Sequence, residues 1–253
     1  MDLRIKQIED FSLNAWPSHQ MQLYDGWILR FSYFYTHRTN CVEQIGPSSI
    51  PISEKIEYCE AEYKHWGTPA IFKITPLVDH DFDHLLKRQG YSIQHVTNVM
   101  TADLTQPILQ APQIDCSIHC SSYISDRWIQ ALLRLKHTTN PRHISVVPSM
   151  YRAIPKETIA VSIRDQNDRI LATGLGIPDR NYIGVYAIHV HPEYRNRGYA
   201  HAIVSKILKE GKKRGADSAY LQVIEETSPA ISLYHSFGFH RFYRYWFRVK
   251  DRL

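Results

Sequence analysis

The 253-residue sequence predicts an α/β (α+β) fold in which helices flank a mixed sheet. Three observations lead to this prediction. Apolar, β-rich segments alternate along the chain with segments whose apolar residues recur at helical spacing. One of these strands runs directly into a basic, Gly-containing turn and a strongly periodic helix. The order of strands and helices in the first half also recurs in the second, so we expect two related halves.

In the first half, residues 1–25 have a mixed pattern that predicts only a turn, at Trp16-Pro17. Aromatic and apolar segments after it predict buried strands. Ser53 is expected to cap a helix that ends at Gly67. The predicted elements, in chain order, are strands 26–34 and 39–45, helix 53–67, strand 70–75, helix 81–89 and strand 96–102.

A Pro-containing linker, residues 105–113, precedes the second half, and we place a domain boundary near residue 110. The first domain is then 1–110 and the second 111–253. Asn and Asp in residues 166–168 favour a hairpin turn. The predicted elements are strand 114–121, helices 125–137 and 144–154 (the second interrupted by Pro148), strands 157–164, 169–177 and 185–190, helix 200–215, strand 219–224, helix 229–237 and strand 242–250.

The composition is that of a soluble globular protein, with 43% hydrophobic and 22% charged residues. No apolar run approaches the roughly 18 residues that span a bilayer, so no membrane partner is expected. The N-terminus has no signal-peptide core, which predicts a cytoplasmic protein. The cysteines show no C-x-x-C pair or zinc spacing, so we expect reduced thiols and no metal at Cys41, Cys59, Cys116 and Cys120.

The turn of residues 195–200 has the features of an anion site. The start of a helix presents unpaired backbone N–H groups and the positive end of the helix dipole. Gly198 lets the backbone approach a ligand closely, Arg195 and Arg197 add charge-assisted donors, and Ala200 keeps the helix start open. The net charge is +5, and the basic residues are mostly scattered except at this turn and on the following helix, which favours a polyphosphate-bearing ligand over nucleic acid.

A constant shift of 148 positions relates the two halves. It matches six pairs without a gap: Gly26 with Gly174, Val42 with Val190, Gly67 with Gly215, Leu85 with Leu233, Gly90 with Gly238, and Tyr91 with Phe239. The same shift sets Pro47 opposite Arg195, Ile50 opposite Gly198, Ile52 opposite Ala200, and Leu86 opposite Tyr234. The first half therefore lacks the anion site. We expect it to support the second half, to form a lid or to contribute to the acceptor pocket; the alternative is that it is an unrelated α+β domain.

The motif Arg195-x-x-Gly198-x-Ala200, between a strand and a helix and followed by LQVIEETSPAISLYHSFGF at 221–239, resembles the GNAT (GCN5-related N-acetyltransferase) superfamily. Its Gln/Arg-x-x-Gly-x-Gly/Ala signature cradles the pyrophosphate of acetyl-CoA. The resemblance covers residues 114 to the C-terminus. The first half is similar to the degenerate copy of the tandem members, which keep one active copy.

The resemblance implies a binding site for acetyl-CoA and a role for each matching residue. Backbone amides of residues 197–200 would bind the pyrophosphate, and residues 188–190 would pair with the pantetheine arm. Thr227 stands where the family often has Asn, a departure from the pattern. The implied cofactor-binding residues are Ile188, His189, Val190, Arg195, Asn196, Arg197, Gly198, Tyr199, Ala200 and Thr227.

Tyr234 matches the tyrosine of the family that donates to the departing CoA sulfur, as a general acid. A phenol of pKa about 10 facing a thiol of about 8.5 loses only some 2 kcal/mol on full proton transfer. The alternative is that Tyr234 is simply a buried aromatic residue of a helix. The general base stays open among Tyr186, His189, Glu193, Glu225 and Glu226.

The sequence therefore predicts an acetyl-CoA-dependent N-acetyltransferase, a monomer or homodimer, that acts on the primary amine of an unidentified acceptor. Because no cysteine falls within the motif, we expect direct attack in a ternary complex. One rival is a non-catalytic acyl-CoA-binding sensor or scaffold. The other is a nucleic-acid-binding module, whose binding would weaken steeply with salt.

Overall fold

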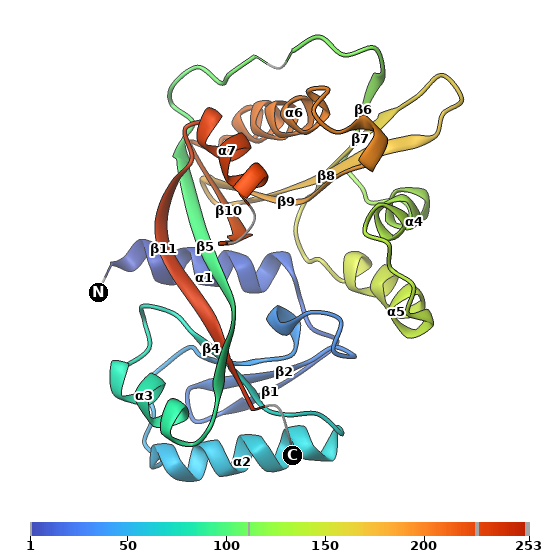
Figure 1. The fold of residues 1–253 in the computed structure, drawn as a ribbon. Helices are drawn as coiled ribbons and strands as arrows, with labels where there is room; N and C mark the ends of the chain where they lie inside the picture. Colours follow the sequence, from blue (N-terminus) through green and yellow to red (C-terminus); the bar gives the residue numbers. More distant parts are fainter. Residues whose placement is uncertain (1, 111, 226–227, 251–253) are drawn as a thin grey trace.

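The computed structural model describes residues 2–110, 112–225 and 228–250, and in these ranges seven α-helices surround one sheet of eleven strands (Figure 1). The strand order is β1-β2-β3-β4-β11-β5-β10-β9-β8-β7-β6. The pairs β3–β4 and β9–β10 are parallel, whereas the other neighbours are antiparallel. The predicted mixed sheet flanked by helices is confirmed.

The elements have the following bounds. The strands are β1 Gln20–Tyr24, β2 Trp27–Phe31, β3 Val42–Gln44, β4 Ile71–Ile74, β5 Ser92–Asp103, β6 Ser117–Ser121, β7 Ile159–Arg164, β8 Ile170–Asp179, β9 Tyr182–Val190, β10 Ser218–Ile224 and β11 His240–Val249. The helices are α1 Leu3–Ala15, α2 Ile52–His65, α3 His80–Arg88, α4 Asp126–Leu135, α5 Pro141–Arg152, α6 Tyr199–Lys213 and α7 Ser228–Ser236, with short 3₁₀ turns at His37–Thr39 and Pro192–Tyr194.

The last strand of each half pairs with the other half. β5 lies beside β10, with partners from Asp103–Ser218 to Thr97–Ile224. β11 in turn lies between β4 and β5. Figure 1 shows β5 and β11 running through the middle of the molecule, with α6 and α7 toward one end and α2 and α3 toward the other. The two halves share one sheet, and their division at residue 110 stays a prediction.

The shift of 148 positions also relates the helices and strands of the structure. It carries α2 onto α6, α3 onto α7, and β5 onto β11 within a residue or two. The four helices also end alike, with a left-handed glycine whose following amide donates to a carbonyl five residues earlier. These glycines are Gly67, Gly90, Gly215 and Gly238. The shared plan supports the interpretation of two related halves, and their origin by duplication stays a prediction.

The N-terminal segment differs from the prediction, since residues 3–15 form α1 and residues 20–24 form β1. The carboxylate of Asp2 caps α1 by accepting from the amide of Arg4 at 2.9 Å. Ile8, Phe11 and Ala15 are buried on one face of the helix. This spacing is helical, but the charged residues between the apolar ones hide it when the segment is examined alone.

Two further helix predictions are wrong in detail. Ser53 is not the cap of α2, because the helix already begins at Ile52; the carboxylate of Asp25 accepts from the amide of Ile50 ahead of it. Pro148 does not interrupt α5, which is continuous from Pro141 to Arg152. Proline removes one helical hydrogen bond, and the burial of the adjacent Val147 offsets that loss.

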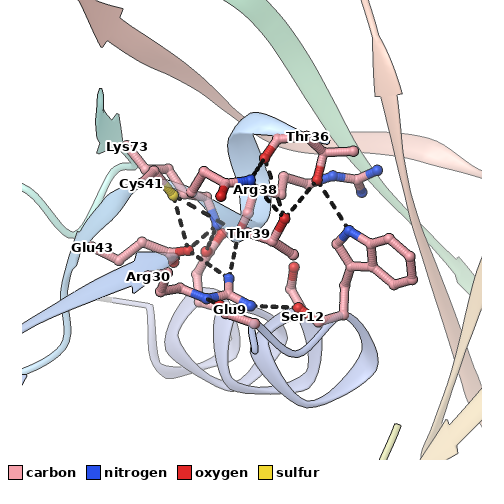
Figure 2. Close-up of polar contacts among 12 residues, drawn as sticks. Glu9, Ser12, Arg30, Thr36, Arg38, Thr39, Cys41, Glu43 and Lys73 are labelled. Carbon is pink, nitrogen blue, oxygen red and sulfur yellow. Dashed lines mark hydrogen bonds and ion pairs between the residues drawn. The ribbon is translucent and has the colours of Figure 1, made fainter. Parts of the chain in front are cut away.

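A buried cluster of charges joins α1 to three strands, as Figure 2 shows. Lys73 on β4 pairs with Glu9 on α1 and with Glu43 on β3, the latter at 3.2 Å. Arg30 on β2 pairs with the other oxygen of Glu43 at 3.2 Å. Tyr243 on β11 donates to Glu9 at 2.5 Å. Two cations and two carboxylates balance one another away from water, so none of the four charges is left unpaired.

The same cluster holds the segment of residues 36–41 in place. The guanidinium of Arg30 donates to the carbonyl of Arg38, and the thiol of Cys41 approaches the same oxygen at 3.9 Å. The side-chain amide of Asn40 donates to the carbonyl of Thr36 at 2.6 Å. Side chains therefore satisfy the backbone of this loop, which makes it a fixed part of the fold.

We expect Lys73→Met to lower the free energy of unfolding by about 3–5 kcal/mol, because Glu9 would stay buried without a cation and Glu43 would keep only Arg30. Burial opposes the ionisation of Glu43, but Lys73 and Arg30 outweigh it and lower the pKa of that carboxyl. The stabilisation that comes from the ionised carboxylate of Glu43 is present above the pKa of this group in the unfolded chain. It is lost as the pH falls through the lower pKa of the group in the folded protein.

Urea unfolding of wild type and of Lys73→Met at neutral pH measures the difference in the free energy of unfolding. This difference should become smaller below about pH 4. Lys6→Met on exposed α1 surface is the matched control, with an expected change under about 0.5 kcal/mol. Equal losses in the two variants would contradict a stabilising role of the cluster.

Candidate active site

The parallel strands β9 and β10 separate part of the way along. Their pairing runs from Tyr182–Ser218 to Val185–Leu221, and no pair follows among the described residues. Beyond this point β9 carries a bulge against β8, with one extra residue near Ala187. Ala187 has a φ of 52°. A bulge bends its strand, so the end of β9 is turned away from β10.

A cavity of about 880 Å³ lies at the end of β9. Its walls come from the last residues of β9, the turn and first residues of α6, α7, and the linker between the halves. The lining residues are Leu109, Gln110, Pro112, Ile188, His189, Val190, Tyr194, Arg195, Asn196, Gly198, Tyr199, Ala200, His201, Ala230, Ser232, Leu233 and Tyr234. This volume is at the upper end of the range of small-molecule and cofactor sites.

The turn at the start of α6 needs glycine. Gly198 caps the helix with a φ of 79°, and Asn196 before it has a φ of 59°. The helix makes its first bond from the amide of Ala202 to the carbonyl of Gly198, so the preceding amides have no partner within the helix. A Cβ on Gly198 would lie 2.5 Å from the ring of Pro112. The turn therefore offers unpaired donors beside the cavity.

Most of the residues that the motif predicts for the cofactor lie around this one cavity. Two do not. The guanidinium of Arg197 lies over the ring of Tyr194, 5.3 Å from its centroid, and Arg197 is absent from the lining. Thr227 lies outside the described residues. The roles of all these residues stay predictions.

Several lining residues were not predicted from the sequence. His201 lies three residues after the predicted Gly198, so helical spacing could have identified it, whereas Leu233 is adjacent to Tyr234 and does not follow from that spacing. The linker residues Leu109, Gln110 and Pro112 carry no such signal. Their position depends on α6, because Ser205 donates to the carbonyl of Leu109 at 3.1 Å.

Tyr199 anchors the start of α6. Its side chain is buried, and its hydroxyl donates to the carboxylate of Asp115 at 2.9 Å and lies 3.0 Å from the sulfur of Cys116. Burial, together with the hydrogen bonds to Cys116 and Asp115, raises the pKa of Tyr199. The hydroxyl is therefore occupied by the chain itself, which leaves the backbone amide of Tyr199 for a ligand.

Tyr234 on α7 forms part of the cavity wall and is mostly buried, with its ring 6.0 Å from that of Phe239. Burial raises the pKa of Tyr234 to about 12. The phenol is therefore protonated at neutral pH and can act as a hydrogen-bond donor toward the cavity.

The candidates for a general base have different surroundings. Burial, with Lys136 and Arg195 nearby, lowers the pKa of His189 to about 4, so its imidazole is neutral. Glu225 pairs with Arg244 at 3.2 Å and does not line the large cavity. Glu193 is largely exposed.

Tyr186 lies beside the hydroxyl of Tyr220, and Glu226 is outside the described residues. His189 is therefore the one of the five that the structure brings to the lining of the large cavity, among the residues described.

Three general features of the chain complete the description of the site. All four cysteines are free thiols, as predicted. Within the described ranges, no group of three or more His, Cys, Asp or Glu side chains could hold a metal ion. No helix in the same ranges has the length and apolar character required to cross a membrane.

Solved structures of GNAT proteins share this fold. A GCN5-related N-acetyltransferase from Kribbella flavida matches with a TM-score of 0.68 at 13% identity, over 99% of this chain and 95% of that one. A tandem GNAT protein from the clavulanic acid biosynthesis pathway matches with a TM-score of 0.65 at 12% identity, over 84% and 76%.

The chain belongs to the family described as "Probable histone acetyltransferase Rv0428c C-terminal", whose model matches residues 3–248. It is 26% identical over 250 residues to "Uncharacterized N-acetyltransferase YobR" of Bacillus subtilis (strain 168), covering 97% of this chain and 98% of that protein. It is 29% identical over 77 residues to an acetyltransferase of Yersinia pestis (strain Pestoides F), spanning about half of that protein, 55%. The chain is thus an N-acetyltransferase of the tandem GNAT type.

The geometry of the turn gives a stability prediction. Gly198→Ala should lower the free energy of unfolding by about 1–2 kcal/mol for the left-handed backbone, and by more for the contact with Pro112. Gly215→Ala, at a φ of 87° with open space around it, should show the backbone cost alone. Urea unfolding of both variants measures the difference, and equal losses would show that the Pro112 contact is absent in solution.

Proposed function

We propose that the chain transfers an acetyl group from acetyl-CoA to a primary amine by direct attack in a ternary complex. One observation carries this proposal: the end of β9, the unpaired amides at the start of α6 and the hydroxyl-bearing Tyr234 converge on one cavity of about 880 Å³. The turn would bind an anion, and Tyr234 would act as a hydrogen-bond donor in the same cavity.

Acetyl-CoA fits the residues present. The unpaired amides of the turn and Arg195 would bind the pyrophosphate, since donors and the helix dipole both favour a negative group there. The backbone of residues 188–190, which has left β10, would pair with the amides of the pantetheine arm.

Acetyl-CoA would supply the acetyl group, and CoA would leave as the thiol. The nitrogen of the amine bonds to the carbonyl carbon as the carbon–sulfur bond breaks; one proton leaves the nitrogen and one reaches the sulfur. Full proton transfer from Tyr234, at a pKa of about 12, to a thiolate of pKa about 8.5 would cost about 5 kcal/mol. Tyr234 therefore acts by donating a hydrogen bond that stabilises the developing charge.

His189 is a weak acceptor for the proton of the amine. An ammonium of pKa about 10.4 would lose about 9 kcal/mol on full transfer to an imidazole whose pKa is about 4. We infer that the amine enters the reaction neutral, after losing its proton to water, with His189 as an uncharged neighbour.

An acyl-enzyme on cysteine has no support in the lining of the cavity. None of the described lining residues is a cysteine, and Cys116 contacts the buried hydroxyl of Tyr199 instead. A concave cavity also favours a small acyl carrier over a nucleic-acid duplex. The cytoplasmic location and the monomeric or homodimeric state stay predictions.

Tyr234→Phe tests the proposal against a non-catalytic acyl-CoA sensor. We expect the turnover to fall about 100-fold, because the donor to the sulfur is lost, while the dissociation constant for acetyl-CoA stays within about twofold. Thiol release with a panel of primary amines measures turnover, and calorimetry measures binding.

Tyr123→Phe, which removes a hydroxyl from an exposed ring, is the matched control and should behave as wild type. A sensor would bind acetyl-CoA without thiol release in any of the three proteins. Unchanged turnover in Tyr234→Phe would reject the donor role and leave the transferase proposal standing.

A further inference from the structure

Two smaller cavities are lined by residues of both halves. The first, of about 120 Å³, shares His189 with the large cavity and is bordered by α1, α4, α5, β8 and β9. The second, of about 250 Å³, reaches β10 and β11. Both are lined by Tyr35, Thr36 and Arg38 of the first half, so the N-terminal half faces the cavity that we assign to the acyl donor.

Positive charge dominates both of these cavities. Arg38 lines both and Lys136 lines the first, and no Asp or Glu is present among the described lining residues. Arg38 donates to the side-chain oxygen of Gln222 at 2.9 Å, and Lys136 to the hydroxyl of Tyr35 at 2.6 Å. In the parts of the chain that the structure describes, neither cation has a carboxylate partner.

Neutral residues surround these two cations. Burial and the nearby His95 lower the pKa of His37 to about 4, and His189 is neutral for the reason given above. The rings of Trp16 and Tyr151 stand 4.9 Å apart on the wall of the smaller cavity. A half-buried guanidinium in these surroundings favours the binding of an anion, because its hydration is reduced and no carboxylate among the described residues neutralises its charge.

The position of Arg38 is fixed before any ligand binds. The carbonyl of Arg38 accepts from Arg30, which belongs to the buried cluster in Figure 2, and Thr36 accepts from the indole of Trp16 at 3.1 Å. A charged group held in this way loses little conformational freedom when it binds, which favours affinity.

We propose that these cavities hold the acceptor, and that the acceptor is a small primary amine which also carries an anionic group, a carboxylate or a phosphate, bound by Arg38 and Lys136. This inference rests on the proposed function. The amine would then lie toward His189 and the large cavity, with the apolar part of the molecule against the aromatic wall. The first half thereby provides acceptor recognition, and a polyamine would be disfavoured by like charge.

The test compares amines that differ only in the anionic group: an amino acid with its amide, and an aminosugar phosphate with the free aminosugar. Thiol release from acetyl-CoA gives kcat and KM for each, and the two pairs distinguish carboxylate from phosphate. We expect at least one anionic member to be the better substrate by 10-fold or more in kcat/KM.

Arg38→Gln should raise the KM of the anionic member about 10- to 100-fold and change that of its neutral partner less than about threefold. Lys136→Met should have a similar but smaller effect, since Lys136 is more exposed. The matched controls are Arg142→Gln, whose guanidinium lies over Tyr33, and Arg134→Gln on α4; neither residue lines the cavities. In all four variants acetyl-CoA should bind as in wild type.

Four outcomes would overturn the inference. If acetyl-CoA binds and neutral amines are acetylated as well as anionic ones, the acceptor assignment fails and the proposed function stands. The same holds if no anionic amine is acetylated, or if Arg38→Gln raises the KM of both members of a pair equally. If wild type does not bind acetyl-CoA, the proposed function fails and this inference fails with it.

Discussion

The exchange of β5 and β11 between the halves is the constraint on which the arrangement of this protein depends. β5 pairs along the whole of β10, and β11 fills the space between β4 and β5. Backbone hydrogen bonds that are satisfied in this way leave no free strand edge between the halves. The loop of residues 35–38 is therefore fixed relative to β9, close enough for Arg38 to reach Gln222 on β10.

The two halves use one plan for different purposes. In the second half the parallel strands part beside a glycine turn, which leaves a cavity with unpaired donors. In the first half β3 and β4 pair at only Val42–Phe72, and the cavity of about 310 Å³ near their ends is lined by Glu9, Glu43 and Lys73. Buried ion pairs therefore line the first-half cavity, whereas the shift of 148 positions sets Pro47 and Ile50 opposite the anion turn of residues 195–200. The ion pairs stabilise the packing of α1, so this half has gained a structural core in place of an anion site.

Local sequence was sufficient for the parts of the fold that depend on local physics. The helix after Gly198 and the helix ends at Gly67 and Gly215 follow from periodicity and from the tolerance of glycine for positive φ. The turn with its basic residues was recognisable because the anion site needs a strand, a glycine and a helix start in that order.

The remainder depends on contacts between distant parts of the chain. The exchange of strands between the halves cannot be predicted from local sequence, because the pattern of β11 would be the same whichever strand it paired with. The bulge at Ala187 needs a left-handed alanine, which local propensity disfavours, and the linker wall at Pro112 depends on its packing against α6. The cation-rich cavities combine residues more than 100 positions apart, so only the folded chain brings them together.

Calorimetric titration of the full chain with acetyl-CoA tests the central claim most directly. We predict saturable binding with a dissociation constant below about 50 µM and one site per chain, because the anion turn of residues 195–200 occurs once. We also predict that Gly198→Ala binds acetyl-CoA at least about 10-fold more weakly than Gly215→Ala. Absence of binding by wild type at that concentration, or two equivalent sites per chain, would contradict the central claim.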